Sequence, residues 1–126
     1  MRGLLAVSSI LPLILTACAP EPEPPRLRLA LDCSLSYDAL SAKVLAQPDL
    51  IAAPQERGEP YRFYNVRGGG EAFVFTQEGA PGHPAVLKQE AVQENGRKVM
   101  KNTGCAYGDK AGFDQVMAYL ESLSAR

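Results

Sequence analysis

His83 is the residue of this chain best suited to acid–base chemistry, because it is the only histidine among the 126 residues. An imidazole titrates near neutral pH and acts as a general base when a nucleophile or carboxylate lies beside it. His83 stands in Pro81-Gly82-His83-Pro84, and no Ser, Cys or Asp pattern nearby recruits it. Flanking glycine and proline are typical of a turn. We therefore predict a turn residue; the alternative is a hydrolytic pairing with a carboxylate such as Glu78.

A second candidate for chemistry is the run Arg67-Gly68-Gly69-Gly70, whose backbone N–H groups could hold an anion. Phosphate-binding loops normally lead from a strand into a helix. Here the segment that follows, 71–76, has the residues expected of a strand. The glycine run is therefore predicted to be a turn within a hairpin.

Aromatic side chains precede that turn. Tyr61 and Phe63 alternate with Arg62 and Tyr64, so the two pairs occupy opposite faces of a predicted strand. If Tyr61 and Phe63 join the leucines of segment 27–31 in the core, Arg62 and Tyr64 point to solvent. Tyrosine and arginine are enriched in binding interfaces, although solvated sheet faces also carry them. Arg62 and Tyr64 are our candidate partner patch.

The N-terminal segment has the pattern of an export signal. Arg2 is its only charge, and Leu4 to Leu15 is almost wholly apolar but shorter than the ~20 apolar residues that span a bilayer. The run ends in Leu15-Thr16-Ala17-Cys18, which resembles the lipobox of bacterial lipoprotein precursors. The alternatives are a plain secretory signal and a buried helix. Pro12 and the prolines after Cys18 disfavour the helix.

The resemblance implies that residues 1–17 are a signal peptide and that a lipid is attached to Cys18 after cleavage. Two or three acyl chains would hold the protein at the membrane, because each buried CH₂ contributes ~0.8 kcal/mol. Ala19 is not the aspartate that retains many such proteins at the inner membrane of enteric bacteria. The resemblance therefore favours the outer membrane of a bacterial envelope, facing the periplasm.

Residues 18–25 are interpreted as the lipidated cysteine and a tether. After Cys18 the sequence reads Ala-Pro-Glu-Pro-Glu-Pro-Pro, and its prolines favour polyproline II at ~3.1 Å per residue. Glu21 and Glu23 argue against a tether that lies on anionic lipid. We expect a semi-rigid spacer of about 20 Å between the membrane and the folded domain.

With Cys18 assigned to lipid, Cys33 and Cys105 are left in an oxidising compartment. A disulfide between them is the default expectation. A redox centre would normally show Cys-x-x-Cys, and a zinc site would need two close pairs of ligands. The sequence has neither pattern, so we predict a structural disulfide and no metal or other cofactor.

Composition limits the partners and the number of domains. Thirteen basic and 14 acidic side chains give a formal net charge of −1 without any run of like charge. A nucleic-acid binder would show a basic stripe, so that class is disfavoured. Residues 26–126 are enough for one domain.

The periodicity of that domain predicts an α+β fold with the order β-α-β-β-β-β-α. The expected strands cover 26–31, 61–66, 71–76, 85–94 and the segment after the turn Asn95-Gly96; the helices follow Ser36 and span about 112–123. We expect an antiparallel sheet of about five strands with both helices on one face and one disulfide. The Asn-Gly turn would place Val92 opposite Val99 and Glu90 opposite Lys101.

These features favour a non-enzymatic binding or assembly module, held on the membrane by Cys18 and contacting an envelope protein. This interpretation rests on the small size of the domain and on the lack of a recognisable set of catalytic residues in the sequence. Two alternatives remain open: a small envelope hydrolase using His83 with a carboxylate, and an inhibitor of an enzyme that targets the envelope.

Overall fold

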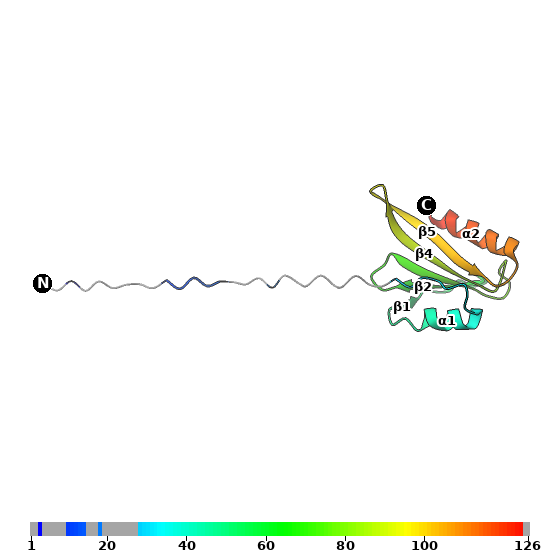
Figure 1. The fold of residues 1–126 in the computed structure, drawn as a ribbon, viewed down its shortest axis with the longest axis horizontal. Coiled ribbons are helices and arrows are strands. Elements are labelled where there is room, and N and C mark those ends of the chain that lie inside the picture. Colours follow the sequence, from blue (N-terminus) through cyan, green and yellow to red (C-terminus); the bar gives the residue numbers. More distant parts are fainter. Residues whose placement is uncertain (1–2, 4–9, 15–17, 19–27, 125–126) are drawn as a thin grey trace.

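The computed structural model describes residues 3, 10–14, 18 and 28–124 (Figure 1). The predicted tether at 19–25, most of the signal peptide, and Leu27 lie outside these residues. Within the described part of the chain, no helix has the length and apolar character needed to cross a membrane.

Five strands lie between two helices in the sequence. The helices are α1 (Tyr37–Leu45) and α2 (Lys110–Ser124), and the strands are β1 (Leu50–Ala52), β2 (Tyr61–Val66), β3 (Glu71–Thr76), β4 (Ala85–Glu94) and β5 (Arg97–Ala106). The sheet order is β1-β2-β3-β4-β5, and every neighbouring pair is antiparallel. The predicted α+β class with a five-stranded antiparallel sheet is confirmed.

The predicted position of the first strand is wrong. The described residues of 26–31 form no strand, and the fifth strand is instead β1, in a segment expected to be a surface loop. Leu29 and Leu31 do pack against the core, so their alternation marks burial without strand pairing. The extended segment 28–33 lies on a face of the sheet, and we call it the strap.

The prediction that both helices cover one face of the sheet is also wrong. Figure 1 shows α1 and α2 on opposite sides of the sheet. Leu40 and Val44 of α1 join the core cluster of Phe73 and Phe75, whereas Val116 and Leu120 of α2 join the cluster of Val74. Because β3 alternates between these two clusters, it is buried from both sides, and a sheet of this kind needs cover on both faces.

The β4–β5 hairpin follows the predicted register. Asn95 and Gly96 have φ values of 51° and 75°, the positive pair that a type I′ turn requires. Val92 pairs with Val99 and Glu90 with Lys101, as expected. The hairpin therefore places Glu90 and Lys101 on the face that α1 and the strap partly cover.

Side-chain caps start both helices. The Ser36 hydroxyl accepts a hydrogen bond from the Ala39 N–H at 3.2 Å, which confirms the predicted cap of α1. The Asp109 carboxylate accepts from the Gly112 N–H at 2.8 Å, so α2 begins earlier than the predicted Gly112.

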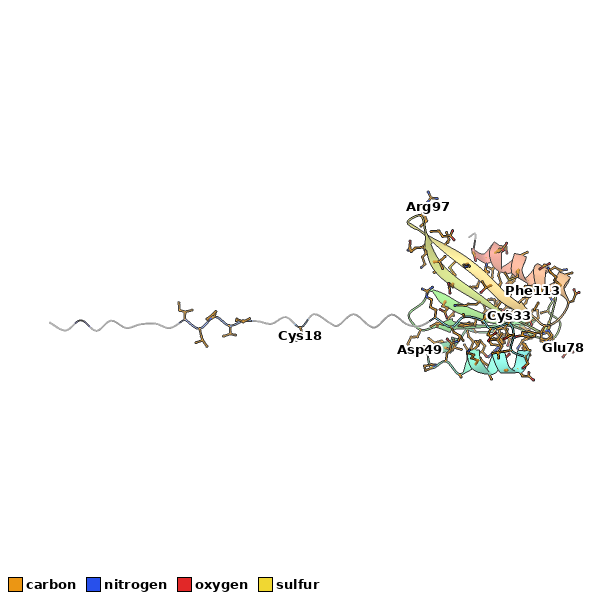
Figure 2. The ribbon with its side chains drawn as sticks, viewed as in Figure 1. Cys18, Cys33, Asp49, Glu78, Arg97 and Phe113 are labelled. Atoms are coloured by element: carbon orange, nitrogen blue, oxygen red, sulfur yellow. A yellow bond between two sulfur atoms is a disulfide. The ribbon has the colours of Figure 1, made fainter. Side chains whose placement is uncertain are left out.

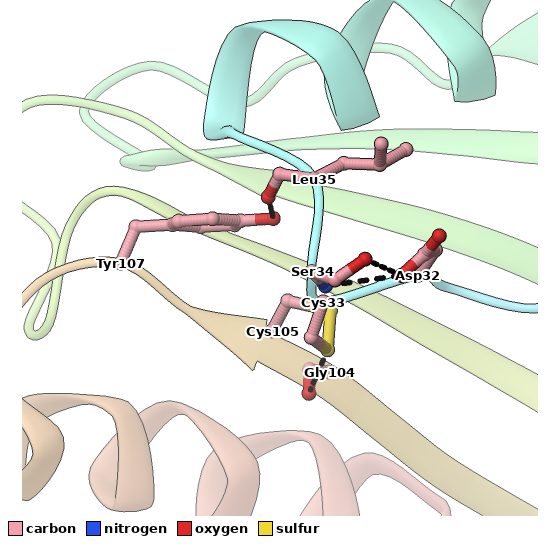
Figure 3. Close-up of a disulfide and its surroundings, with 7 residues drawn as sticks. All are labelled: Asp32, Cys33, Ser34, Leu35, Gly104, Cys105 and Tyr107. Carbon is pink, nitrogen blue, oxygen red and sulfur yellow. Dashed lines mark hydrogen bonds between the residues drawn. A yellow bond between two sulfur atoms is a disulfide. The ribbon is translucent and has the colours of Figure 1, made fainter.

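The predicted disulfide is present. Cys33, at the end of the strap, is bonded to Cys105 near the end of β5, with their Cα atoms 5.2 Å apart. Figure 3 shows the bond joining the segment before α1 to the strand before α2, with the Tyr107 hydroxyl donating to the Leu35 carbonyl at 2.8 Å. The starts of both helices are therefore tied to the same end of the sheet.

Candidate functional site

The strap is held on the sheet at three points. Arg28 Nη1 donates a hydrogen bond to the Ala91 carbonyl at 2.9 Å, and Lys88 Nζ donates one to the Leu29 carbonyl at 2.8 Å. The third point is the disulfide between Cys33 and Cys105. Arg28 is the first described residue of the folded domain, so we call the end of the sheet that it contacts the proximal end. Figure 2 shows Arg97 and Asp49 at this end and Glu78 at the opposite one.

Four charged side chains lie beneath and beside the strap. Lys88 Nζ is 2.7 Å from Glu90 Oε2 and 3.9 Å from Glu71 Oε2, and Arg28 Nε is also 3.9 Å from Glu71 Oε2. The side chains of Lys88 and Glu71 are only 7% and 5% exposed. Among the described residues of this cluster, two cations thus lie beside two anions, as buried charges require.

The pairing also shifts the protonation of Glu90. The hydrogen bond from Lys88 lowers the pKa of the Glu90 carboxyl, and the positive charges of Lys88, Arg28 and Lys101 add to that effect. Partial burial acts in the opposite direction but does not prevail. Glu90 is therefore an anion at neutral pH and holds the Lys88 ammonium in place.

A hollow of about 330 Å³ opens between the strap and the β4–β5 hairpin. We call it the strap pocket. Its lining consists of three strap residues and five from the two strands: Ala30, Leu31, Cys33, Lys88, Glu90, Lys101, Thr103 and Gly104. The volume lies at the small end of ligand sites, and the lining combines charged, hydroxyl and apolar groups.

Two further hollows, of about 350 and 310 Å³, adjoin at the proximal end. Both are bounded by the turn 67–70 and by the β4–β5 hairpin, and they share Gly69, Gly70, Ala91 and Lys98. We call the pair the proximal groove. Arg28 lines one part of it, and the amide side chains of Asn65 and Gln89 line the other, together with the carboxylate Glu71.

His83 is exposed, but its ring is held in the turn before β4. Nδ1 lies 2.8 Å from the hydroxyl of Thr76, which is itself only 2% exposed. The same hydroxyl accepts a hydrogen bond from the Ala85 N–H at 2.8 Å. The His83 and Tyr37 rings pack against each other in a T-shaped arrangement. Within residues 28–124, no hydrogen bond or ion pair joins His83 to Glu78. These contacts link β3 to β4 and give the imidazole a structural role.

Arg62 and Tyr64 share a face of β2, as predicted, and the Arg62 guanidinium lies 5.8 Å from the centre of the Tyr64 ring. That face is the one covered by α1. Tyr64 is half-buried and packs edge-on against Phe75, while Tyr61 and Phe63 pack on the α2 side. The expectation that Tyr61 shares a core face with the strap leucines is therefore wrong, and the candidate patch offers little free aromatic surface.

Cys18 is exposed and is not part of the disulfide. Its lipidation remains a prediction from the sequence. Among the described residues, no group of three or more His, Cys, Asp or Glu side chains is placed to hold a metal ion.

Reasoning from the sequence missed the charged cluster of Arg28, Glu71, Lys88 and Glu90. One signal was available, since Lys88 interrupts the apolar start of β4 and a lysine facing a core must find partners. The involvement of Arg28 could not be read from the sequence, because it depends on the strap lying on the sheet.

The fold and these hollows define an α+β domain, a five-stranded meander between two helices, with a disulfide-fastened strap. No family model matches the chain, and no curated protein or solved structure is significantly similar to it.

Proposed function

We propose that the protein is a lipid-anchored envelope module that binds a partner without catalysis. In this proposal residues 1–17 are removed, Cys18 carries the lipid, and residues 26–126 form the domain on its tether. The expected location is the periplasmic side of the outer membrane.

The observation that supports a binding role best is the position of the strap pocket. Its wall is formed by the segment that leads directly to the anchor, and the disulfide and the Lys88 contact keep that wall in place. A preformed hollow with a fixed wall binds without a large ordering cost. The strap pocket is therefore our candidate site for the partner.

The proposed tether keeps this site close to the membrane. Seven residues, 19–25, separate Cys18 from the domain that begins at residue 26. At ~3.1 Å per residue, this proline-rich segment reaches about 20 Å. A partner in the membrane or just above it would lie within that range.

The hydrolase alternative has less support. It requires the His83 imidazole to reach a carboxylate such as Glu78, whereas the ring contacts Thr76 and Tyr37. A Thr76 hydroxyl that is buried and already bonded to Ala85 is poorly placed to act as a nucleophile. An inhibitor of an envelope-targeting enzyme would be one form of the proposed module.

Site-specific photo-crosslinking in the native envelope tests the proposed binding role. A photoreactive amino acid is placed at Thr103, an exposed residue that lines the strap pocket, and in a separate variant at Glu121, an exposed residue of α2. We expect a discrete adduct from position 103 and none from position 121. The same adducts from both positions, or none from either, would contradict the assignment.

A further inference from the structure

We propose that the proximal groove is a binding site for a phosphate group, with Arg28, Lys98 and the amides of the glycine turn as the donors. This site lies apart from the strap pocket. It does not depend on lipid at Cys18, and so it goes beyond the function proposed above.

Arg28 is already oriented for such a role. Nη1 is fixed by the Ala91 carbonyl and Nε lies 3.9 Å from the Glu71 carboxylate. Nη2 faces the turn, since a Cβ added at Gly70 would lie 3.8 Å from it. The guanidinium therefore retains N–H donors directed at the groove, and a planar, pre-oriented guanidinium binds phosphate oxygens well.

The glycine turn supplies backbone donors. Gly68, Gly69 and Gly70 all have positive φ values, of 94°, 80° and 82°, so this backbone strongly favours glycine. The Gly69 N–H is bonded to the Val66 carbonyl. Within residues 28–124, the N–H groups of Gly68 and Gly70 have no such acceptor. Backbone N–H groups of a turn can serve as donors to a bound anion.

The charged groups that line or contact the groove have a positive sum, although one of its lining residues is the carboxylate Glu71. Arg28 and Lys88 are balanced by Glu71 and Glu90, whose carboxylates they contact. Lys98 lines both parts of the groove. Its positive charge is additional to the two positive and two negative charges of Arg28, Lys88, Glu71 and Glu90. Arg28, Lys98 and Gly68 to Gly70 line the same hollow, and charged donors of this kind form strong hydrogen bonds to phosphate oxygens.

The experiment uses the full chain with Cys18→Ser, held in an uncharged detergent, and follows the amide resonances of Gly68 to Gly70 by NMR. The first probe is inorganic phosphate, compared with chloride at equal ionic strength. We expect saturable shifts with phosphate alone. Equal shifts with chloride, or no shifts with phosphate, would overturn the proposal.

Two variants of equal charge provide the matched control. Lys98→Ala removes a groove residue, whereas Arg97→Ala removes its exposed neighbour, which lines neither part of the groove. Loss of one charge-assisted contact of about 1 kcal/mol corresponds to roughly fivefold weaker binding, so we expect that change for Lys98→Ala and almost none for Arg97→Ala. Equal weakening by both variants would show general charge attraction and contradict the site.

A second variant, Arg28→Lys, keeps the charge but removes the planar fork. It should weaken phosphate binding while the other amide resonances show an unchanged fold. Unchanged affinity would remove Arg28 from the site and overturn the proposal as stated.

The source of the phosphate is decided by two further probes. Glycerol 3-phosphate is a monoester, like most soluble phosphorylated compounds, and glycerophosphoglycerol is a diester, like a phospholipid headgroup. Tighter binding of the diester would assign the site to lipid headgroups, and tighter binding of the monoester would assign it to a soluble ligand. Failure of both to bind would contradict the site without bearing on the anchoring at Cys18.

Discussion

The ammonium group of Lys88 lies 2.7 Å from a carboxylate oxygen of Glu90, two residues further along the same strand and on the same face. Lys88→Ala would remove the buried cation that lies 2.7 Å from Glu90 and 3.9 Å from Glu71. Loss of one partner of a buried pair costs about 3 kcal/mol or more, so the free energy of unfolding in urea should fall by that order.

Lys101→Ala is the control for this change. Lys101 is exposed and stands opposite Glu90 in the β4–β5 register. Its loss should cost less than about 1 kcal/mol, as for other exposed pairs. Similar losses from the two variants would contradict the structural importance of the Lys88 cluster.

The lowered pKa of Glu90 predicts a pH dependence. Its folded-state pKa lies below the ordinary value of 4.5, because Lys88 donates a hydrogen bond to the ionised form. The resulting stabilisation is present above pH 4.5 and is lost as the pH falls through the folded-state pKa. Glu90→Gln should be less stable than the unaltered chain at pH 7, and the difference should shrink toward pH 3. A difference that stays constant from pH 7 to pH 3 would show that the carboxylate charge is not responsible.

The disulfide should contribute strongly to stability. Cys33 and Cys105 are 72 positions apart, and in the chain-entropy model closing a loop of that size is worth roughly 4 kcal/mol. Cys33→Ser should therefore lower the free energy of unfolding by a few kcal/mol. It also frees Cys105, which is 2% exposed and should react slowly with thiol reagents. Two freely reactive thiols at these positions in exported protein would contradict the bond.

The contact between Thr76 and His83 should be structural. Thr76→Val leaves the buried Ala85 N–H without its acceptor, so we expect a loss of about 1–3 kcal/mol. His83→Ala should cost less, because the ring is exposed. Contacting residues show coupling of about 0.5 kcal/mol or more in a double-mutant cycle. Additive effects would argue that the Thr76–His83 contact contributes nothing to the fold.

Local patterns predicted much of this fold. The Asn95-Gly96 turn specified the register of β4 and β5, and Ser36 marked the start of α1, because each depends on short-range chemistry. The disulfide was predicted from the number of cysteines and from the expected oxidising compartment. That prediction first assigned Cys18 to lipid, because the segment that ends in Cys18 resembles a lipobox.

The arrangement of the layers could not be predicted in the same way. The alternating positions of Leu29 and Leu31 fit two arrangements equally well: a strand within the sheet, and a strap that lies on the sheet. Both arrangements bury one side of an extended chain. The two-sided burial of β3 was visible in Phe73, Val74 and Phe75, but their pattern alone does not say which helix covers which face. The charged cluster depended on this arrangement and was missed with it.

The proposed function depends on Cys18 joining this domain to the membrane. Mass spectrometry of the protein extracted from the membranes of its native host tests it most directly. We predict a chain that begins at Cys18 and carries two or three acyl chains, and for Cys18→Ala an uncleaved chain without lipid. A native chain with an unmodified Cys18, or one that begins at another residue, would show that Cys18 is not the lipid anchor.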